Sequence, residues 1–221
     1  MEQNWITKTI DKMTEDRRSF FWDSCVTLQI NGISGDYVEF GSYGGHSLSL
    51  AYEALSLIGS PRHLWAFDSF AGLPEITDPR DERWRTSLDI NQGGVENFHA
   101  DCAKLGVPRE AYTAVEGYFA DTLPPLGTRG APSDIAFVYV DCNMYSSTVT
   151  VFEFLAPRLK HGMIVAFDDY YLWSSSEVSG ERSALDEFLV ANPQWHFHRY
   201  KDVHYAGLAF VVEHADRVRV K

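Results

Sequence analysis

Residues 35–47 read GDYVEFGSYGGHS and combine a short apolar strand with a glycine-rich turn. The strand signal covers Asp36 to Phe40, and a helical pattern, SLSLAYEALSLI, follows from Ser47 to Ile58. Glycines at such a junction let the backbone turn sharply and approach a ligand, and the start of the helix offers free N–H groups. The stretch therefore predicts the first strand-to-helix junction of a doubly wound α/β fold.

The rest of the chain alternates between the same two kinds of element. Short apolar runs predict further strands, and longer runs with a helical period predict helices between them. The expected strands are residues 63–67, 112–116, 135–140, 163–167, 195–200 and 206–212, and the expected helices are residues 11–29, 95–105, 146–159 and 182–190. Strands that are apolar on both faces are typical of a mostly parallel sheet with helices on both sides. We therefore expect a Rossmann-like α/β domain over residues 35–221, with seven strands, after a helical preamble over residues 1–34.

Composition limits the class of partner. A chain of 221 residues with 45% hydrophobic content is long enough to bury one sizeable core. Its formal net charge of −12 disfavours nucleic acids and anionic membranes, which are bound through clustered Lys and Arg. We expect a small-molecule partner and leave homo-oligomerisation open. The start of the chain lacks the pattern of a secretory signal, no run is apolar enough to suggest a membrane span, and Cys25, Cys102 and Cys142 have no paired spacing, so we expect reduced thiols in a cytoplasmic protein.

One stretch, Ala71 to Gly94, departs from the alternation. It is polar, contains Pro74 and Pro79, and has no clear period. Long loops of this kind are more often functional than ordinary connections.

Candidate cofactor contacts lie where the first three strands end, because ligands of open α/β sheets bind beyond the carboxyl ends of the strands. The spacing E-x-G-x-x-x-G from Glu39 is typical of class I methyltransferases rather than of dinucleotide enzymes. Asp68 ends the second strand at the interval expected of a ribose-binding acid, and Tyr118 is placed to cover an adenine face. The candidate cofactor-binding residues are Glu39, Gly41, Ser42, Tyr43, Gly45, Ser47, Asp68, Ser69, Gly117 and Tyr118. An ordinary strand-to-helix turn and a packing role for Tyr118 remain open.

Carboxylates follow two later strands directly. Asp141 ends the strand at residues 135–140, and Asp168 and Asp169 end the strand at residues 163–167. Carboxylates avoid the edge of a core unless something compensates them, and neighbouring strands would crowd these charges together. Oxygen ligands of this type suit Mg²⁺. The alternative is that Asp141 caps the following helix and that the other two acids merely end a strand.

Five segments in order resemble the macrocin O-methyltransferase family. The segments are residues 35–47 (GDYVEFGSYGGHS), 67–74 (FDSFAGLP), 117–124 (GYFADTLP), 138–148 (VYVDCNMYSST) and 165–170 (VAFDDY). The resemblance implies a class I methyltransferase fold, S-adenosylmethionine as methyl donor, Mg²⁺, and a sugar or glycosylated natural product as the hydroxyl acceptor. It also implies that Asp141 is a metal ligand and the general base, and that Asp168 and Asp169 complete the ligand set.

The resemblance is not complete, and other functions remain to be weighed. Where the family has a small residue and a second acid after Asp141, this chain has Cys142 and Asn143, so that acid is replaced by a neutral amide. A catechol-like acceptor and a non-catalytic binding protein on this fold are the alternatives. An NAD-dependent oxidoreductase would leave the three strand-end acids without a role.

Side chains away from the strand ends receive weaker expectations. We interpret His196, His198 and His204 as packing or surface residues, and expect Trp84, Trp173 and the loop Tyr170 to Ser176 to border the acceptor.

Overall fold

The computed structural model describes residues 4–87, 93–123 and 128–217, in which helices and strands alternate as the sequence predicts. The strands are β1 (Asp36–Phe40), β2 (Leu64–Asp68), β3 (Tyr112–Glu116), β4 (Ile135–Val140), β5 (Ile164–Phe167), β6 (Trp195–Asp202) and β7 (Leu208–His214). The helices are α1 (Trp5–Ile30), α2 (His46–Leu57), α3 (Val95–Lys104), the short α4 (Phe119–Thr122), α5 (Tyr145–Leu155) and α6 (Gly180–Ala191).

These strands form one seven-stranded sheet in the order β3-β2-β1-β4-β5-β7-β6. Strands β1 to β5 pair in parallel, whereas β7 runs antiparallel to both β5 and β6. The strand order reverses between β1 and β4, and such a switch point is where open α/β sheets bind ligands. The predicted fold class, a Rossmann-like α/β fold with a mostly parallel seven-stranded sheet, is confirmed.

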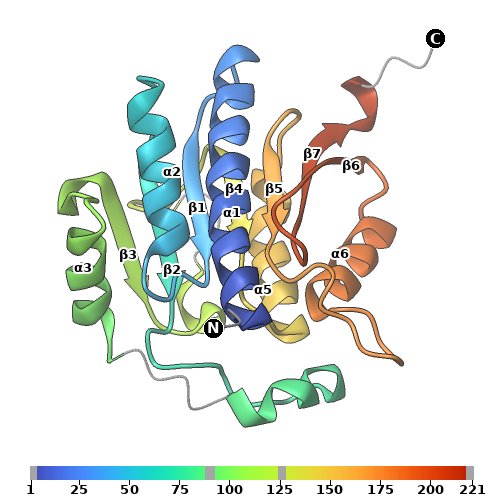
Figure 1. Ribbon diagram of the computed structural model, residues 1–221. Coiled ribbons are helices and arrows are strands. Elements are labelled where there is room, and N and C mark those ends of the chain that lie inside the picture. The colour runs from blue at the N-terminus through green and yellow to red at the C-terminus, as the bar shows by residue number, and fades with distance from the viewer. Residues whose placement is uncertain (1–3, 88–92, 124–127, 218–221) are drawn as a thin grey trace.

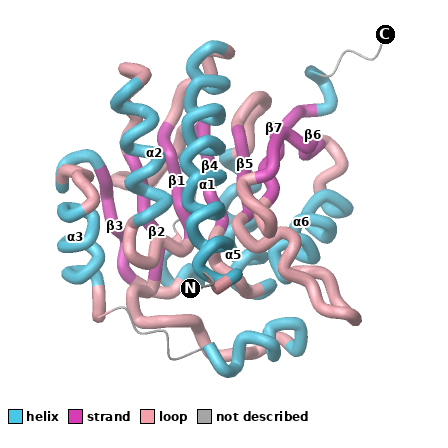
Figure 2. The backbone as a smooth tube through the Cα atoms, viewed as in Figure 1, coloured by secondary structure: helices cyan, strands magenta, loops and turns pink. Residues whose placement is uncertain are grey.

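Helices cover both faces of the sheet (Figures 1 and 2). Helices α1, α2 and α3 share one buried cluster with the strand residues that point toward them, among them Tyr37 and Tyr139. Helices α5 and α6 share a second cluster with the alternate residues, such as Val38 and Val140. Successive strand side chains point to opposite faces, so strands that are apolar throughout supply both layers.

The N-terminal helix is part of this core. It begins at Trp5, six residues before the expected start at residue 11, and ends at Ile30. Phe20 and Phe21 are fully buried, and the Phe21 ring packs against Tyr139 with the two ring centroids 5.1 Å apart. The expected boundary at residue 34 between the helical preamble and the α/β domain stays a prediction. Buried contacts such as that of Phe21 with Tyr139 join the two sides of this boundary.

The polar stretch from Ala71 to Gly94 contains a structured portion. Residues Pro79–Ser87 form a 3-10 helical segment, and residues 88–92 lie outside the described part of the chain. Across the described ranges, no helix combines the length and the apolar character that crossing a membrane requires.

Candidate active site

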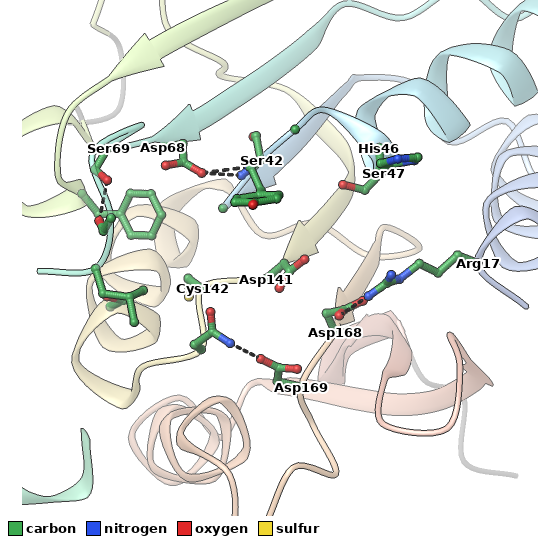
Figure 3. Close-up of a pocket in the computed structure, with 18 of the residues that line it drawn as sticks. Arg17, Ser42, His46, Ser47, Asp68, Ser69, Asp141, Cys142, Asp168 and Asp169 are labelled. Carbon is green, nitrogen blue, oxygen red and sulfur yellow. Dashed lines mark hydrogen bonds and ion pairs between the residues drawn. The ribbon is translucent and has the colours of Figure 1, made fainter. Parts of the chain in front are cut away.

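A pocket of about 640 Å³ opens at the carboxyl ends of the parallel strands (Figure 3). It brings together residues from the glycine-rich loop, from the turns after β2 and β3, and from the acidic ends of β4 and β5. The predicted site residues that line it are Gly41, Ser42, Tyr43, Ser47, Asp68, Ser69, Tyr118, Asp141, Asp168 and Asp169. Glu39, Gly45 and Gly117 were also predicted, but they do not line the pocket.

The glycine-rich loop follows β1 and passes directly over Asp141, the first residue after β4. Gly41 has a φ of +86°, and a Cβ at this position would lie 1.9 Å from the carbonyl oxygen of Asp141. Only glycine permits both this conformation and this approach. The loop therefore brings the glycine-rich half and the acidic half of the pocket into backbone contact.

Asp68 stabilises this loop through hydrogen bonds to its backbone. Its Oδ2 accepts hydrogen bonds from the backbone N–H groups of Ser42 at 2.7 Å and Tyr43 at 3.1 Å, and its Oδ1 accepts one from Phe70 N–H at 2.7 Å. Asp68, for which ribose binding stays a prediction, therefore holds the glycine-rich loop in place. Gly117, beside it, donates from its backbone N–H to the Asp68 carbonyl at 2.9 Å and supports the pocket from behind.

Glu39 lies one layer beneath the loop. It is fully buried and accepts a hydrogen bond from the Tyr37 hydroxyl, while its Oε1 has no hydrogen-bond partner. Burial raises the pKa of its carboxyl to about 7. An ionisable oxygen without a partner beneath a ligand-binding loop can serve a polar group that enters with a ligand.

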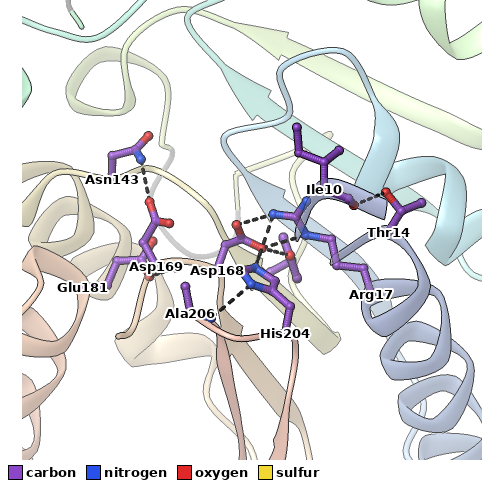
Figure 4. Close-up of polar contacts among 10 residues, drawn as sticks. Ile10, Thr14, Arg17, Asn143, Asp168, Asp169, Glu181, His204 and Ala206 are labelled. Atoms are coloured by element: carbon purple, nitrogen blue, oxygen red, sulfur yellow. Dashed lines mark hydrogen bonds and ion pairs between the residues drawn. The ribbon is translucent and has the colours of Figure 1, made fainter. Parts of the chain in front are cut away.

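The three strand-end acids have very different surroundings. Asp168 receives Arg17 Nε at 3.1 Å, Arg17 Nη2 at 2.5 Å, His204 Nε2 at 2.9 Å and the Tyr139 hydroxyl (Figure 4). His204 Nδ1 accepts the backbone N–H of Ala206 at 3.1 Å, so its Nε2 carries the proton that it donates. Burial alone would raise the pKa of Asp168, but the His204 hydrogen bond and the Arg17 charge outweigh it and hold the pKa at about 2.

The other two acids face the pocket without a cationic partner. Burial and the charge of Asp168 raise the pKa of Asp169 to about 7, and Asn143 Nδ2 donates to Asp169 Oδ2 at 2.5 Å. Burial and the charges of Asp168 and Asp169 raise the pKa of Asp141 well above its ordinary value. No donor among the described residues reaches the Asp141 carboxylate, as Figure 3 illustrates. The fully buried Glu181, whose Oε2 accepts the Asp169 backbone N–H at 2.9 Å, adds a fourth acid behind this pair.

The donor set is chemically suited to a hard divalent cation, although the side chains are not arranged as a closed metal cage. Within the described ranges, no three His, Cys, Asp or Glu side chains are grouped so as to hold an ion. Asp141 is half-buried and Asp169 is buried, and a cation would relieve the repulsion between their carboxylates. Asp168 is already paired with Arg17, so its oxygens become available only if Arg17 moves away.

Several residues of this site were not predicted. Arg17 lines the pocket from α1, and His204 was interpreted as a packing or surface residue although it is buried against Asp168. That interpretation holds for His196 and His198, which are exposed on β6. A basic residue on the polar side of a helix gives no signal that it will meet a carboxylate 151 positions later. The alternative that Asp141 caps α5 is wrong, because the carboxylate that accepts the first helical N–H groups belongs to Asp81.

Neither Trp84, Trp173 nor the loop from Tyr170 to Ser176 is among the described residues that line the pocket, so their place beside an acceptor stays a prediction. The three cysteines are buried free thiols, as expected.

Comparison with known proteins agrees with this geometry. The chain is 32% identical over 154 residues to the 8-demethyl-8-(2,3-dimethoxy-alpha-L-rhamnosyl)-tetracenomycin-C 4'-O-methyltransferase of Streptomyces olivaceus, covering 66% of this chain and 57% of the relative. It is 27% identical over 161 residues to the mycinamicin III 3''-O-methyltransferase of Micromonospora griseorubida, covering 68% and 61%. The matched region thus spans less than two thirds of the length of either relative.

The fold also matches a solved structure, that of the O-methyltransferase NovP, with a TM-score of 0.73, 21% identity, and coverage of 89% of this chain and 79% of that one. The family model described as macrocin O-methyltransferase (TylF) matches residues 5–192, from the start of α1 through α6. The match covers the glycine-rich loop, the acidic strand ends and Arg17, and the chain therefore belongs to the macrocin O-methyltransferase (TylF) family.

Proposed function

We propose that this protein transfers the methyl group of S-adenosylmethionine to a sugar hydroxyl of a glycosylated natural product. The observation that carries the proposal is a single pocket in which a glycine-rich loop meets three strand-end carboxylates. Membership of the macrocin O-methyltransferase family supports the reaction class. Two relatives, named as methyltransferases of a rhamnosyl-tetracenomycin and of mycinamicin III, support the class of acceptor.

The cofactor half of the pocket suits an adenosyl sulfonium. S-adenosylmethionine supplies a methyl group already activated for transfer to oxygen. The Gly41 backbone permits close approach of its amino-acid part, and the buried Glu39 oxygen without a partner lies beneath that loop. Tyr118 lines the pocket beside Phe119 and offers a face for the adenine. Asp68 accepts three backbone donors, so about one of its four lone-pair sites remains for a ribose hydroxyl.

The acidic half is suited to the acceptor hydroxyl and to Mg²⁺. Asp141 and Asp169 would hold the ion. Asp168 would also bind it once Arg17 had moved away from the Asp168 carboxylate. A bound divalent cation lowers the pKa of an alcohol and fixes its direction. The residues themselves are preorganised for this task, since His204 and Tyr139 continue to orient the Asp168 carboxylate.

Asp141 is the proposed general base. Its carboxylate lines the pocket and accepts no hydrogen bond from the described residues, so its oxygens can accept the hydroxyl proton. When Asp141 takes the hydroxyl proton, the oxygen attacks the methyl carbon and the carbon–sulfur bond breaks, leaving S-adenosylhomocysteine. Orientation and electrostatics supply most of the acceleration, because no covalent enzyme intermediate forms.

Two measurements test the proposal. Calorimetry should detect S-adenosylhomocysteine binding in the micromolar range, with a matching rise in melting temperature by linkage. Methyl transfer from labelled S-adenosylmethionine should then be measured with the rhamnosyl-tetracenomycin, mycinamicin III and catechol as acceptors, with EDTA and after Mg²⁺ is restored. We expect transfer to a glycosylated acceptor that EDTA abolishes and Mg²⁺ restores.

Each of the other possible outcomes would contradict one specific part of the proposal. Absence of S-adenosylhomocysteine binding at millimolar concentration would remove the methyltransferase assignment. Transfer to catechol alone would remove the sugar, and full activity after exhaustive chelation would remove the metal.

A further inference from the structure

A carboxylate from the long polar loop is built into the start of α5. Asp81 lies in the 79–87 segment, which forms the blue-green helical turn at the lower edge of Figure 1, and it is fully buried. Its Oδ1 accepts the backbone N–H of Tyr145 at 2.6 Å, and its Oδ2 accepts the backbone N–H of Ser146 at 3.1 Å and the Ser146 hydroxyl at 2.7 Å. Three donors of one helix terminus therefore converge on a residue 64 positions earlier in the chain.

Helix α5 has no cap of its own. Met144 occupies the capping position and makes no side-chain hydrogen bond to the helix. The first N–H groups of a helix lack partners inside the helix, and an acidic oxygen placed there satisfies them and interacts favourably with the helix dipole. Because Tyr145 is buried, water does not substitute readily for Asp81, and losing the carboxylate would leave buried donors unsatisfied.

The residues just before this helix are the ones that face the proposed reaction. Asp141 leaves β4 with its backbone N–H donating to the Phe40 carbonyl at 2.8 Å, which fixes one end of the connection. Asn143 follows with a φ of +62° and directs its amide to Asp169. The start of α5 lies at the other end of the connection, and that is where Asp81 binds.

The neighbouring contacts of the same segment are weaker anchors. The Arg80 guanidinium lies 3.3 Å from the centroid of the Tyr145 ring and forms an ion pair with Glu187 at 2.8 Å, but Arg80 and Glu187 are both substantially exposed. Exposed pairs contribute little to stability because water screens them. The buried Asp81 carboxylate is therefore the contact that fixes the segment to α5.

We propose that Asp81 is a positioning residue for methyl transfer. By holding the first turn of α5, it fixes the Asp141–Met144 connection so that the Asp141 carboxylate and the Asn143 amide keep their directions in the pocket. Asp81 itself does not line the pocket and acts only through α5. The catalytic part of this inference rests on the proposed function, whereas the geometric part is independent of it.

Three substitutions at the cap form a graded series. Asp81→Ala removes all three hydrogen bonds, Asp81→Asn keeps an acceptor for only one of the two backbone N–H groups, and Ser146→Ala removes only the hydroxyl bond. Leu155→Ala is the matched control, because it destabilises the same helix through the core at its far end. Asp81→Asn also keeps the proposal testable if Asp81→Ala does not fold.

The first readout does not need an acceptor. The side-chain amide signals of Asn143 in a ¹⁵N–¹H NMR spectrum, assigned with an Asn143→Ala variant, report the Asn143–Asp169 contact. We expect them to move in Asp81→Ala, to move less in Asp81→Asn, and to stay in place in Ser146→Ala and Leu155→Ala. Unchanged Asn143 signals in Asp81→Ala, or an equal movement in Leu155→Ala, would overturn the inference.

The second readout compares the effect of each variant on kcat with its effect on S-adenosylhomocysteine affinity. The rhamnosyl-tetracenomycin serves as acceptor. Misplacing a reacting group by about 1 Å costs on the order of 10²-fold in rate, so kcat should fall by about that factor in Asp81→Ala while S-adenosylhomocysteine affinity stays within about twofold. A kcat equal to that of Leu155→Ala would overturn the catalytic role. An inactive wild type would instead refute this acceptor and leave the NMR result to decide the geometry.

Discussion

Arg17 and Asp168 join the first helix to the end of the fifth strand through two parallel hydrogen bonds, of 3.1 Å from Nε and 2.5 Å from Nη2. This guanidinium occupies the side of Asp168 that a divalent cation would need. Arg17 and a metal ion should therefore compete for one carboxylate. Replacing Arg17 by Met removes the competitor and leaves a buried charge for the ion to compensate.

We predict that Arg17→Met is less stable than the wild type without metal, and that Mg²⁺ or Mn²⁺ raises its melting temperature more than that of the wild type. Thermal unfolding with increasing metal concentration measures both effects. Arg18→Met is the matched control, since the neighbouring Arg18 pairs with Glu53 in an exposed position. Equal metal-dependent shifts in all three proteins would contradict the competition.

The two kinds of strand-end acid should respond differently to loss of charge. Asp141→Asn removes the proposed base, so turnover should fall at least about 10²-fold whatever the Mg²⁺ concentration. Asp168→Asn leaves the base in place, so raised Mg²⁺ should restore part of its activity. Steady-state kinetics at several Mg²⁺ concentrations separates the two, and a full rescue of Asp141→Asn by Mg²⁺ would disprove its role as base.

Glu39 should make the stability of the ligand-free protein depend on pH. Its pKa in the folded protein is about 7 against an ordinary 4.5, so the unfolded chain loses this proton first as the pH rises. The contribution is favourable at acidic pH and is lost between about pH 4.5 and 7, by roughly 3 kcal/mol at most. Urea unfolding of the wild type and Glu39→Gln across this range should give curves that diverge as the pH rises, with the wild type losing more stability. Parallel curves would mean that Glu39 ionises normally.

Two glycines of one loop offer a paired test of the backbone contact beneath the pocket. Gly41→Ala would place a Cβ 1.9 Å from the Asp141 carbonyl oxygen at a φ of +86°, whereas Gly44→Ala meets no heavy atom within 4 Å. We expect Gly41→Ala to lower the free energy of unfolding by about 2 kcal/mol or more and Gly44→Ala to change it by less than about 0.5 kcal/mol. Chemical denaturation measures both, and similar values would show that the loop relaxes around the added methyl group.

The sequence predicted the parts of this protein that local patterns encode. Strands β1 and β4 match their expected bounds to the residue, because apolar runs on both faces of a buried strand are distinctive. Asp141, Asp168 and Asp169 were predictable because each directly follows such a run. The roles of Arg17, His204 and Asp81 could not be predicted. The local sequence around each of them gives no signal that its side chain will contact a residue far away in the chain.

Long-range packing also decides what the helices do. The start of α1 at Trp5 precedes the expected position because Trp5 and Ile6 are exposed and give no amphipathic signal. The loop from Ala71 to Gly94 was correctly singled out, but no period in it indicates that Asp81 will be buried against a helix 64 residues later.

The distribution of this site along the chain has a consequence during synthesis. Arg17 belongs to the first helix, His204 to the turn before the last described strand, and β7 inserts between β5 and β6. A nascent chain can form β1 to β3 before β6 and β7 have been synthesised, but the acidic half must wait until the β6–β7 hairpin has emerged. Translation that stops before β7 leaves β5 as an open edge and Asp168 without His204. Such products should be prone to aggregation and should lack the proposed activity.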